Sequence, residues 1–287
     1  MKYRFMDRYC SEFRVERMCK VLGVSRSGYY GWRRRPCSKR QRENEEILME
    51  IQESHKRSKG TYGSPRVTAD IRAKGIPCGE NRVARIMRKN GIVARSRRKF
   101  KATTHSRHNL PVAENLLGQK FIAEGPNRVW ASDITYIPTL EGWLYLVVIL
   151  DVFSRRVVGW AMSDRLTAEF VIRALCQAIG RRRPSSGSIL HSDRGVQYAC
   201  ADFQEVLNQY GFIQSMSRKG NCYDNALVES FFHTLKTEQV YLNRYTTRAE
   251  ARQSIFEYIE MFYNRVRRHS TLGYRSPVCF EQEAMVA

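Results

Sequence analysis

Apolar residues change their spacing partway along the chain. In roughly the first third they recur every three or four positions, which is typical of amphipathic helices. From Val129 onward, short apolar runs bounded by turns indicate strands, the first three of them close enough together to predict an antiparallel meander. The predicted strands cover residues 129–137, 143–153, 156–162, 188–191 and 212–215. We therefore expect an all-α region followed by an α/β domain, in which a mixed sheet carries helices on its faces.

Three helices are predicted among and after these strands, over residues 168–179, 201–209 and 248–264. A fourth lies within GNCYDNALVESFFHTLK, residues 220–236, where apolar side chains follow helical spacing. Asp224 or Asn225 is expected to cap its start. At roughly 100° per residue, Asn225, Glu229 and Lys236 fall together at one edge of its apolar face. An ordinary surface helix with solvated charges would show the same pattern.

The first third contains two helical outlines. Residues 12–35 predict a helix, a turn at Gly23 and a second helix capped by Ser25, which is a helix-turn-helix pattern. A small helical hairpin with a solvated basic end fits as well. Residues 43–55 predict another helix, and the basic block 66–98 predicts two short helices, the second ended by Gly91. The candidate DNA contacts in these helices are Arg26, Arg33, Arg34, Arg35, Arg82, Arg85, Arg88, Arg97 and Arg98.

The basic residues are concentrated in this helical region. Residues 1–110 hold 29 Lys and Arg against 10 Asp and Glu, a balance of +19, whereas the remaining residues hold 20 against 18, or +2, which together give the net charge of +21. Such a surface attracts a polyanion through counterion release, so DNA or RNA is the expected partner. An anionic membrane surface is less favoured, because the basic stretches show no long helix with a broad exposed apolar face and no lipidation signal. The longest relevant apolar run, 144–150, is too short to span a bilayer.

Composition and cysteine spacing indicate the compartment and the domain limits. The 8 cysteines form no C-x-x-C pair, so we expect reduced thiols and a cytoplasmic protein. We expect four parts: a basic helix-turn-helix-like region over 1–58, a second DNA-binding block over 59–102, a linker over 103–124 and the α/β domain over 125–287.

Three carboxylates are candidates for chemistry. Asp133 lies inside an apolar strand, where an aspartate is unfavourable unless it is hydrogen-bonded or binds a cation. Asp193 directly follows a short strand, although S-D-R-G is also a common turn sequence. Together with Glu229 they provide the oxygen ligands that hard divalent ions prefer, and two such ions about 4 Å apart can promote phosphodiester chemistry. We expect His191 to have a structural role.

The same residues carry a family resemblance. Asp133, Asp193 and Glu229, with 35 residues between the last two, resemble the D, D(35)E triad of integrase-type transposases. The motifs WASDITYI, HSDRGVQY, SRKGNCYDNALVESFFHTLKTE and YNRVRRHSTLGYRSP resemble the second-frame protein of the insertion-sequence family three transposases. CKVLGVSRSGYYGW and the stretch from YGSPRV to RIMRKNGI resemble its helical DNA-binding region, so the resemblance covers nearly the whole chain.

This resemblance implies an RNase H-like catalytic core in which the triad binds two Mg²⁺ or Mn²⁺ ions. Lys236 matches a basic residue that positions terminal DNA, and Tyr223 and Asn225 match positions near the site. The implied reaction frees a 3′-OH at the element end, which then attacks another phosphodiester. The implied partners are the terminal inverted repeats, target DNA, an upstream-frame protein or fused segment, and further copies of the chain assembled on DNA in the nucleoid.

Two other functions fit the sequence. One is a catalytically silent DNA-binding regulator or domesticated remnant of a transposase, and the other is a structure-selective nuclease on the same fold. The C-terminal arginines Arg265, Arg267, Arg268 and Arg275 are either further DNA contacts or part of a solvated terminus.

Overall fold

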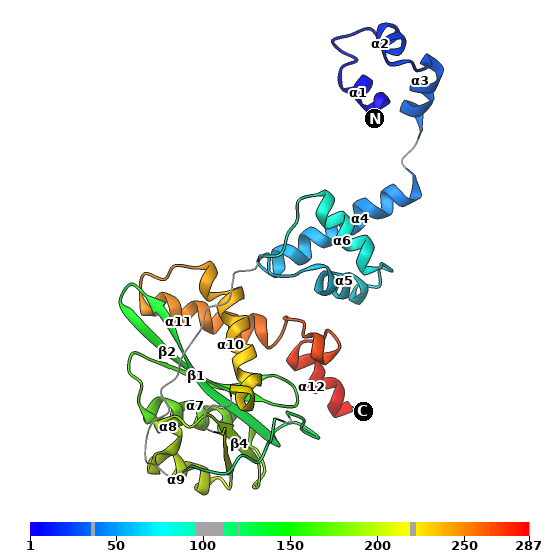
Figure 1. The fold of residues 1–287 in the computed structure, drawn as a ribbon. Helices are drawn as coiled ribbons and strands as arrows, with labels where there is room; N and C mark the ends of the chain where they lie inside the picture. Colours follow the sequence, from blue (N-terminus) through cyan, green and yellow to red (C-terminus); the bar gives the residue numbers. More distant parts are fainter. Residues whose placement is uncertain (36–37, 96–111, 120, 219–221, 287) are drawn as a thin grey trace.

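The structure is a computed structural model that describes residues 1–35, 38–95, 112–119, 121–218 and 222–286 of the 287-residue chain, with Cys222 and Tyr223 described by their backbone alone. Figure 1 shows the helical first third leading into a domain built on one sheet. Arg97 and Arg98 lie outside the described residues, as does the side chain of Tyr223.

The sheet is mixed, with strand order β3-β2-β1-β4-β5. Its strands are β1 (Val129–Thr139), β2 (Gly142–Asp151), β3 (Val157–Ser163), β4 (Ile189–Ser192) and β5 (Ile213–Met216). The first three form the expected antiparallel meander, and β4 and β5 add parallel to β1 and to each other. The predicted strands and the mixed α/β class are therefore confirmed.

Helices cover both faces of this sheet (Figure 1). The helices α7 (Ala168–Arg182), α8 (Val196–Ala199) and α9 (Ala201–Gln209) pack against Trp130 and Val147 on one face. A Cβ on Gly159 of β3 would lie 2.4 Å from the carbonyl oxygen of Ala174, so only glycine allows α7 to approach this closely. The helices α10 (Ala226–Glu238) and α11 (Arg248–Phe256) pack on the opposite face with Ala131 and Leu146.

The helix expected over 248–264 is present over residues 248–263, but its second half is not an α-helix. After α11 the backbone continues as a wider π-helical segment, η3 (Glu257–Tyr263). A short turn, η4 (Ser270–Leu272), and a further helix, α12 (Pro277–Val286), follow. Helix α12 was not predicted from the sequence; its Pro277 occupies the first helical turn and its Glu281 is buried.

The first helical outline is confirmed. The helices α1 (Lys2–Arg8), α2 (Val15–Leu22) and α3 (Arg26–Arg34) pack around Met6, Met18 and Tyr29. Gly23 ends α2 at φ 59°, and the Ser25 hydroxyl accepts a hydrogen bond of 3.0 Å from the Gly28 amide at the start of α3. Gly23 therefore ends α2 and Ser25 caps α3, as the sequence predicted.

The second unit begins earlier than residue 59. The helix α4 (Lys39–Arg57) contributes Ile47 and Ile51 to the same apolar cluster as α5 (Ser64–Ala73) and α6 (Glu80–Lys89). The expected boundary between residues 58 and 59 thus falls inside one packed unit. The apolar spacing of α4 indicated a helix but could not indicate which neighbours would bury it.

Part of the expected linker belongs to the α/β domain. The Leu116 amide donates to the Ser215 hydroxyl at 3.0 Å, and the Met216 amide donates to the Glu114 carbonyl at 3.3 Å. Leu117 joins the apolar cluster beneath α10. Residues 112–119 therefore lie along β5, although they lack the alternating pattern of a strand.

Candidate active site

Asp133 lies in the middle of β1, opposite Val148 of β2. Side chains alternate along a strand, so Asp133 shares a face with Ala131 and Ile137, which pack in the cluster that includes α10. One carboxylate oxygen accepts a 2.7 Å hydrogen bond from the Ile134 amide. The strand thus places a half-buried carboxylate beneath α10.

Asp193 directly follows β4, the strand next to β1, and is level with Asp133. Ala131 pairs with His191 in the parallel β1–β4 ladder, and each aspartate follows two residues later along its strand direction. The chain leaves β4 after Ser192, and the Asp193 carboxylate then accepts a 2.9 Å hydrogen bond from the Gly195 amide. The S-D-R-G sequence therefore forms a turn, and this turn carries the candidate site residue Asp193.

Glu229 lies in the first turn of α10 and is exposed. The expected side-chain cap of this helix is wrong. Asn225 occupies the N-cap position without a capping hydrogen bond, and the Asp224 carboxylate instead accepts hydrogen bonds from the backbone and guanidinium of Arg218 and from the side chains of Asn115 and Gln119. These contacts hold the pKa of Asp224 well below its ordinary value, chiefly through Arg218.

The electrostatics connect the three candidate carboxylates. Burial raises the pKa of Asp133 well above its ordinary value, the charges of Asp193 and Glu229 raise it further, and Lys236 opposes them. Glu229 is exposed, but partial desolvation of its carboxylate also raises its pKa. Within the described parts of the chain, no three His, Cys, Asp or Glu side chains stand close enough together to hold one metal ion. The arrangement is a set of mutually repelling carboxylates, which a cation would stabilise.

Asn225 adds a further oxygen next to Asp133. The Asn225 side chain is 5% exposed, and its amide nitrogen lies 3.5 Å from the Ser132 carbonyl. Its amide oxygen is buried and accepts no hydrogen bond from any described residue. Burying an oxygen without a partner is unfavourable, so this atom is available to a ligand. The donors near Asp133 are thus all oxygens, as Mg²⁺ and Mn²⁺ prefer.

Lys236 lies on the same side of α10 as Glu229. Its ammonium is 5.0 Å from the centre of the Tyr136 ring, and Tyr136 contacts Trp143 edge to face. Burial lowers the pKa of Lys236, whereas the charge of Asp133 raises it. The sequence placed Lys236 beside Glu229 correctly, but it gave no sign of the two partly exposed rings on the β1–β2 hairpin.

His191 forms hydrogen bonds that connect the elements around the site. The Asp224 carbonyl can only accept, so His191 donates from Nε2 over 2.7 Å and accepts at Nδ1 from the Ser215 hydroxyl over 2.8 Å. Burial lowers the pKa of His191, which favours this neutral form. His191 therefore joins β4, β5 and the start of α10.

The arginines proposed from sequence to contact DNA lie on the helical units. Arg26 pairs with Glu16, and Arg33 lies 3.4 Å from Asp7. Arg82 is held by Glu43 at 3.0 Å and by Asn44. Exposed positions are occupied by Arg34, Arg35, Arg85 and Arg88.

The C-terminal arginines include residues whose role the sequence did not reveal. Arg267 is 4% exposed and donates two hydrogen bonds to Glu238, at 2.7 and 2.8 Å. Arg268 binds the Asp70 carboxylate of α5, and its amide donates to the Tyr62 hydroxyl at 2.8 Å. The expectation of a solvated terminus is therefore wrong for Arg267 and Arg268. Arg268 joins the α4–α6 unit to the α/β domain, whereas Arg267 binds Glu238 of α10 within the α/β domain.

Comparisons with known proteins agree with this architecture. The HTH-like domain family matches residues 41–100, and two integrase core domain families match residues 123–222 and 210–277. None of the helices in the described ranges is long and apolar enough to cross a membrane.

Two curated relatives match almost end to end. The chain is 47% identical over 285 residues to transposase InsF for insertion sequence IS3A of Escherichia coli (strain K12), and the match covers 99% of both proteins. It is 48% identical over 266 residues to the uncharacterized 31 kDa protein of insertion element IS600 of Shigella sonnei, covering 93% of this chain and 98% of that protein.

Solved structures overlap more weakly. The HTLV-2 integrase catalytic core domain in complex with magnesium covers 55% of this chain and 98% of its own, with a TM-score of 0.40 and 18% identity. The BIV integrase catalytic core domain covers 56% and 98%, with a TM-score of 0.42 and 19% identity. The family assignment rests on the close sequence relatives.

Proposed function

Because the chain belongs to the IS3 family of insertion-sequence transposases, we propose that Asp133, Asp193 and Glu229 are its catalytic carboxylates and that it cuts and joins DNA strands at the element ends. The observation that supports this most strongly is that Asp133 on β1 and Asp193, directly after the adjacent parallel strand β4, lie at one level of the sheet, with the charge of Glu229 acting on Asp133. Repulsion of this kind is unfavourable in an apo protein and typical of functional sites.

The oxygen donors fit Mg²⁺ or Mn²⁺, and Asp133, Asp193 and Glu229 are the residues that would hold two such ions once drawn closer together than in this structure, with the free oxygen of Asn225 beside them. When bound, the ions supply Lewis acidity for phosphodiester chemistry. The carboxylates would hold the ions, and their oxygens can accept the proton that a hydroxyl nucleophile loses.

The proposed reaction has two steps. In the first, a water oxygen attacks phosphorus at the element end, the bond from phosphorus to the 3′ oxygen breaks, and a 3′-OH is released. In the second, that 3′-OH attacks another phosphodiester, forming a new phosphorus–oxygen bond as an old one breaks. In the family pattern this attack occurs near the other end of the same strand and gives a circular intermediate. The protein forms no covalent bond with DNA.

Lys236 and Asn225 are proposed to position the reacting end. The Lys236 ammonium lies on the Glu229 side of α10, and its contact with the Tyr136 ring limits its freedom. It can therefore hold a phosphate beside the carboxylates. Tyr223, a residue of the turn η1 (Cys222–Asn225), is proposed to act near the same site.

DNA affinity is proposed to come mainly from the helical units, through exposed arginines such as Arg34, Arg35, Arg85 and Arg88. Terminal inverted repeats and target DNA are the proposed substrates. An upstream-frame protein or fused segment, and further copies of this chain on DNA, are the proposed partners.

The test is to incubate the purified chain, with and without the upstream-frame protein, with labelled element ends in Mg²⁺ or in EDTA. Mapping of the products should show 3′-end cleavage and joined strands in Mg²⁺ alone. Binding without any cleavage in either mixture would favour a silent DNA-binding regulator.

A further inference from the structure

A second feature of α10 lies on the side of the helix away from Glu229. A cavity of about 150 Å³ is lined there by Ser230, Phe231 and Thr234. At roughly 100° per residue these side chains point away from the edge that carries Glu229 and Lys236. The cavity is therefore separated from the proposed catalytic carboxylates by the thickness of the helix.

The other walls of this cavity bring basic groups from three parts of the chain. Arg66 comes from α5, Arg155 from the turn between β2 and β3, and Arg267 with His269 from the segment before η4. Guanidinium groups match the geometry of phosphate oxygens, and hydroxyls such as that of Thr234 can donate to them. The space also suffices for a phosphate group and several waters.

The positive charge of the cavity is only partly balanced. Glu238 lies 2.7 Å from Arg267 and 3.4 Å from Arg66, so one carboxylate serves two guanidinium groups. In the described parts of the chain, no carboxylate lies within ion-pair distance of Arg155. Burial together with Arg267, Arg66 and Arg155 lowers the pKa of His269 to about 2, which indicates a local field that disfavours another cation.

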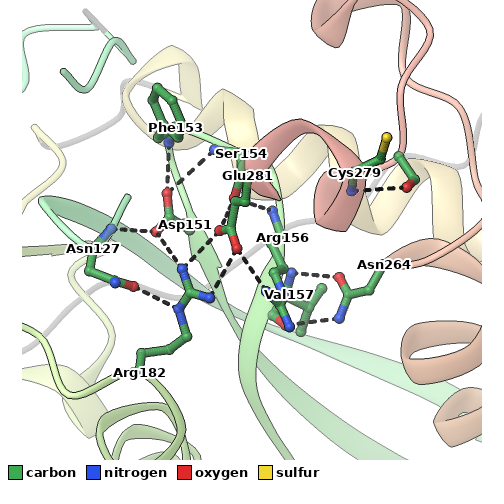
Figure 2. A network of polar contacts seen from close by, with 11 residues as sticks. Asn127, Asp151, Phe153, Ser154, Arg156, Val157, Arg182, Asn264, Cys279 and Glu281 are labelled. Carbon is green, nitrogen blue, oxygen red and sulfur yellow. Dashed lines mark hydrogen bonds and ion pairs between the residues drawn. The ribbon is translucent and has the colours of Figure 1, made fainter. Parts of the chain in front are cut away.

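The turn that carries Arg155 is firmly built, as Figure 2 shows for its neighbours. The Asp151 carboxylate accepts from the Phe153 amide at 2.9 Å, and Ser154 donates to Glu281 of α12 at 2.7 Å. Arg156 also binds Glu281, at 2.7 Å. The Arg155 amide donates to the Asp151 carbonyl at 2.9 Å, so all of the turn is fixed by hydrogen bonds.

Arg155 adopts an unusual backbone conformation within this turn. Its φ is 62°, in the left-handed region that favours glycine and asparagine. An arginine is strained there, and such strained residues are concentrated at functional sites. The turn thus holds a half-buried guanidinium toward the cavity at a position where Asn would fit the backbone better.

We propose that this cavity binds one phosphate group of the DNA backbone, at a point on the strand away from the reacting bond. The proposal rests on the proposed function, since it takes the DNA as substrate. Arg155 is the free cation of the site among the described residues, Arg66 and Arg267 complete it, and Ser230 and Thr234 donate from α10. A DNA strand that is bound on this side of α10 is held in a fixed position relative to Glu229 on the other side.

The experiment scans single methylphosphonates along both strands of the element end and measures binding in EDTA, so that cleavage plays no part. For the unaltered protein, one position should lower affinity by about tenfold. Arg155→Asn should lower affinity for unmodified DNA by a similar factor, and a methylphosphonate at that position should no longer weaken its binding. The slope of log affinity against log salt concentration should fall by about one unit.

Arg183→Asn is the matched control, because Arg183 is exposed, has a φ of 44° and does not line the cavity. It should keep the sensitivity to the same position. Arg155→Asn should melt at the same temperature as the unaltered protein or higher, because Asn suits the turn. Should it fail to fold, Thr234→Val provides a second variant and should weaken the effect of the same methylphosphonate.

A scan in which Arg155→Asn keeps every sensitivity of the unaltered protein overturns the proposal. Inorganic phosphate provides the second arm. If it raises the melting temperature of the unaltered protein and not that of Arg155→Asn, while the scan shows no Arg155-dependent position, the cavity binds free phosphate and the proposal is wrong. A protein that binds no element end at all contradicts the proposed function instead.

Discussion

Asp133 on β1 and Asp193, which directly follows the neighbouring parallel strand β4, stand at the same level of the sheet, each two residues beyond the paired residues Ala131 and His191. Parallel pairing brings the two carboxylates together from positions far apart in the sequence. Burial and the charge of Asp193 act on Asp133 in the same direction, so both make its ionised form less stable. The site is thus unfavourable for the metal-free protein, as expected where catalytic groups are concentrated.

The first prediction concerns this unfavourable charge. Asp133→Asn should raise the free energy of unfolding in EDTA at neutral pH by about 1 kcal/mol, because it removes a half-buried charge and its repulsion with Asp193. Urea denaturation measures the effect. The gain should shrink in Mg²⁺ or Mn²⁺, which stabilise only the unaltered site. A variant that is less stable than the unaltered protein in EDTA would mean that the Asp133 carboxylate is already compensated.

The second prediction concerns Glu238 and Arg267. Glu238→Gln should lower the free energy of unfolding by about 3–5 kcal/mol, because Arg267 is then buried without a balancing charge. The exposed Glu205→Gln is the control and should have little effect. If the pair is coupled, Glu238→Gln combined with Arg267→Gln should lose less than the sum of the two single changes, as a double-mutant cycle in urea would measure. Additive losses would show that the two side chains act independently.

The third prediction concerns Asp70, which lies between Arg57 and Arg268. Burial raises the pKa of Asp70, but hydrogen bonds from Ser54 and Arg268 outweigh it, so the pKa is lowered overall. Its contribution to stability is therefore complete above the ordinary pKa of 3.8 and is lost as pH falls through the lowered value. Asp70→Asn should lower the free energy of unfolding by about 1–3 kcal/mol at pH 7. This loss should become progressively smaller as the pH falls below the ordinary pKa of 3.8.

Melting curves from neutral to acidic pH measure this difference, with the exposed Asp164→Asn as control. Hydrogen exchange should also rise in α5, since Arg268 no longer holds that helix. A loss that stays constant with pH would assign the effect to packing and not to the charge of Asp70.

Much of the α/β domain could be predicted from sequence, because its strands and its helices 168–179 and 201–209 have clear periodicity. Asp133 could also be identified as a candidate site residue, since a carboxylate within an apolar strand is unfavourable unless it is hydrogen-bonded or binds a cation. Arg267 could not: its partner Glu238 lies 29 positions away along the chain, and only the folded structure shows that the two meet. Arg267 and Arg268 therefore resembled DNA contacts.

Asp224 shows a related limit. At the start of a helix an aspartate is expected to cap, because local hydrogen bonds are all that a sequence indicates. In the structure Arg218, Asn115 and Gln119 use its oxygens instead. Tertiary contacts thus replaced the local interaction. The same reason explains why the packing of α4 with α5 and α6 was not foreseen.

The measurement that tests the central claim most directly is strand mapping on element ends with Asp133→Asn, Asp193→Asn and Glu229→Gln, in Mg²⁺ and in Mn²⁺. Asp164→Asn and Glu205→Gln serve as matched controls, and DNA binding is measured for every variant. The account predicts that each of the three changes abolishes cleavage and joining while binding remains, and that both controls stay active. Cleavage at an undiminished rate by any of the three variants would contradict it.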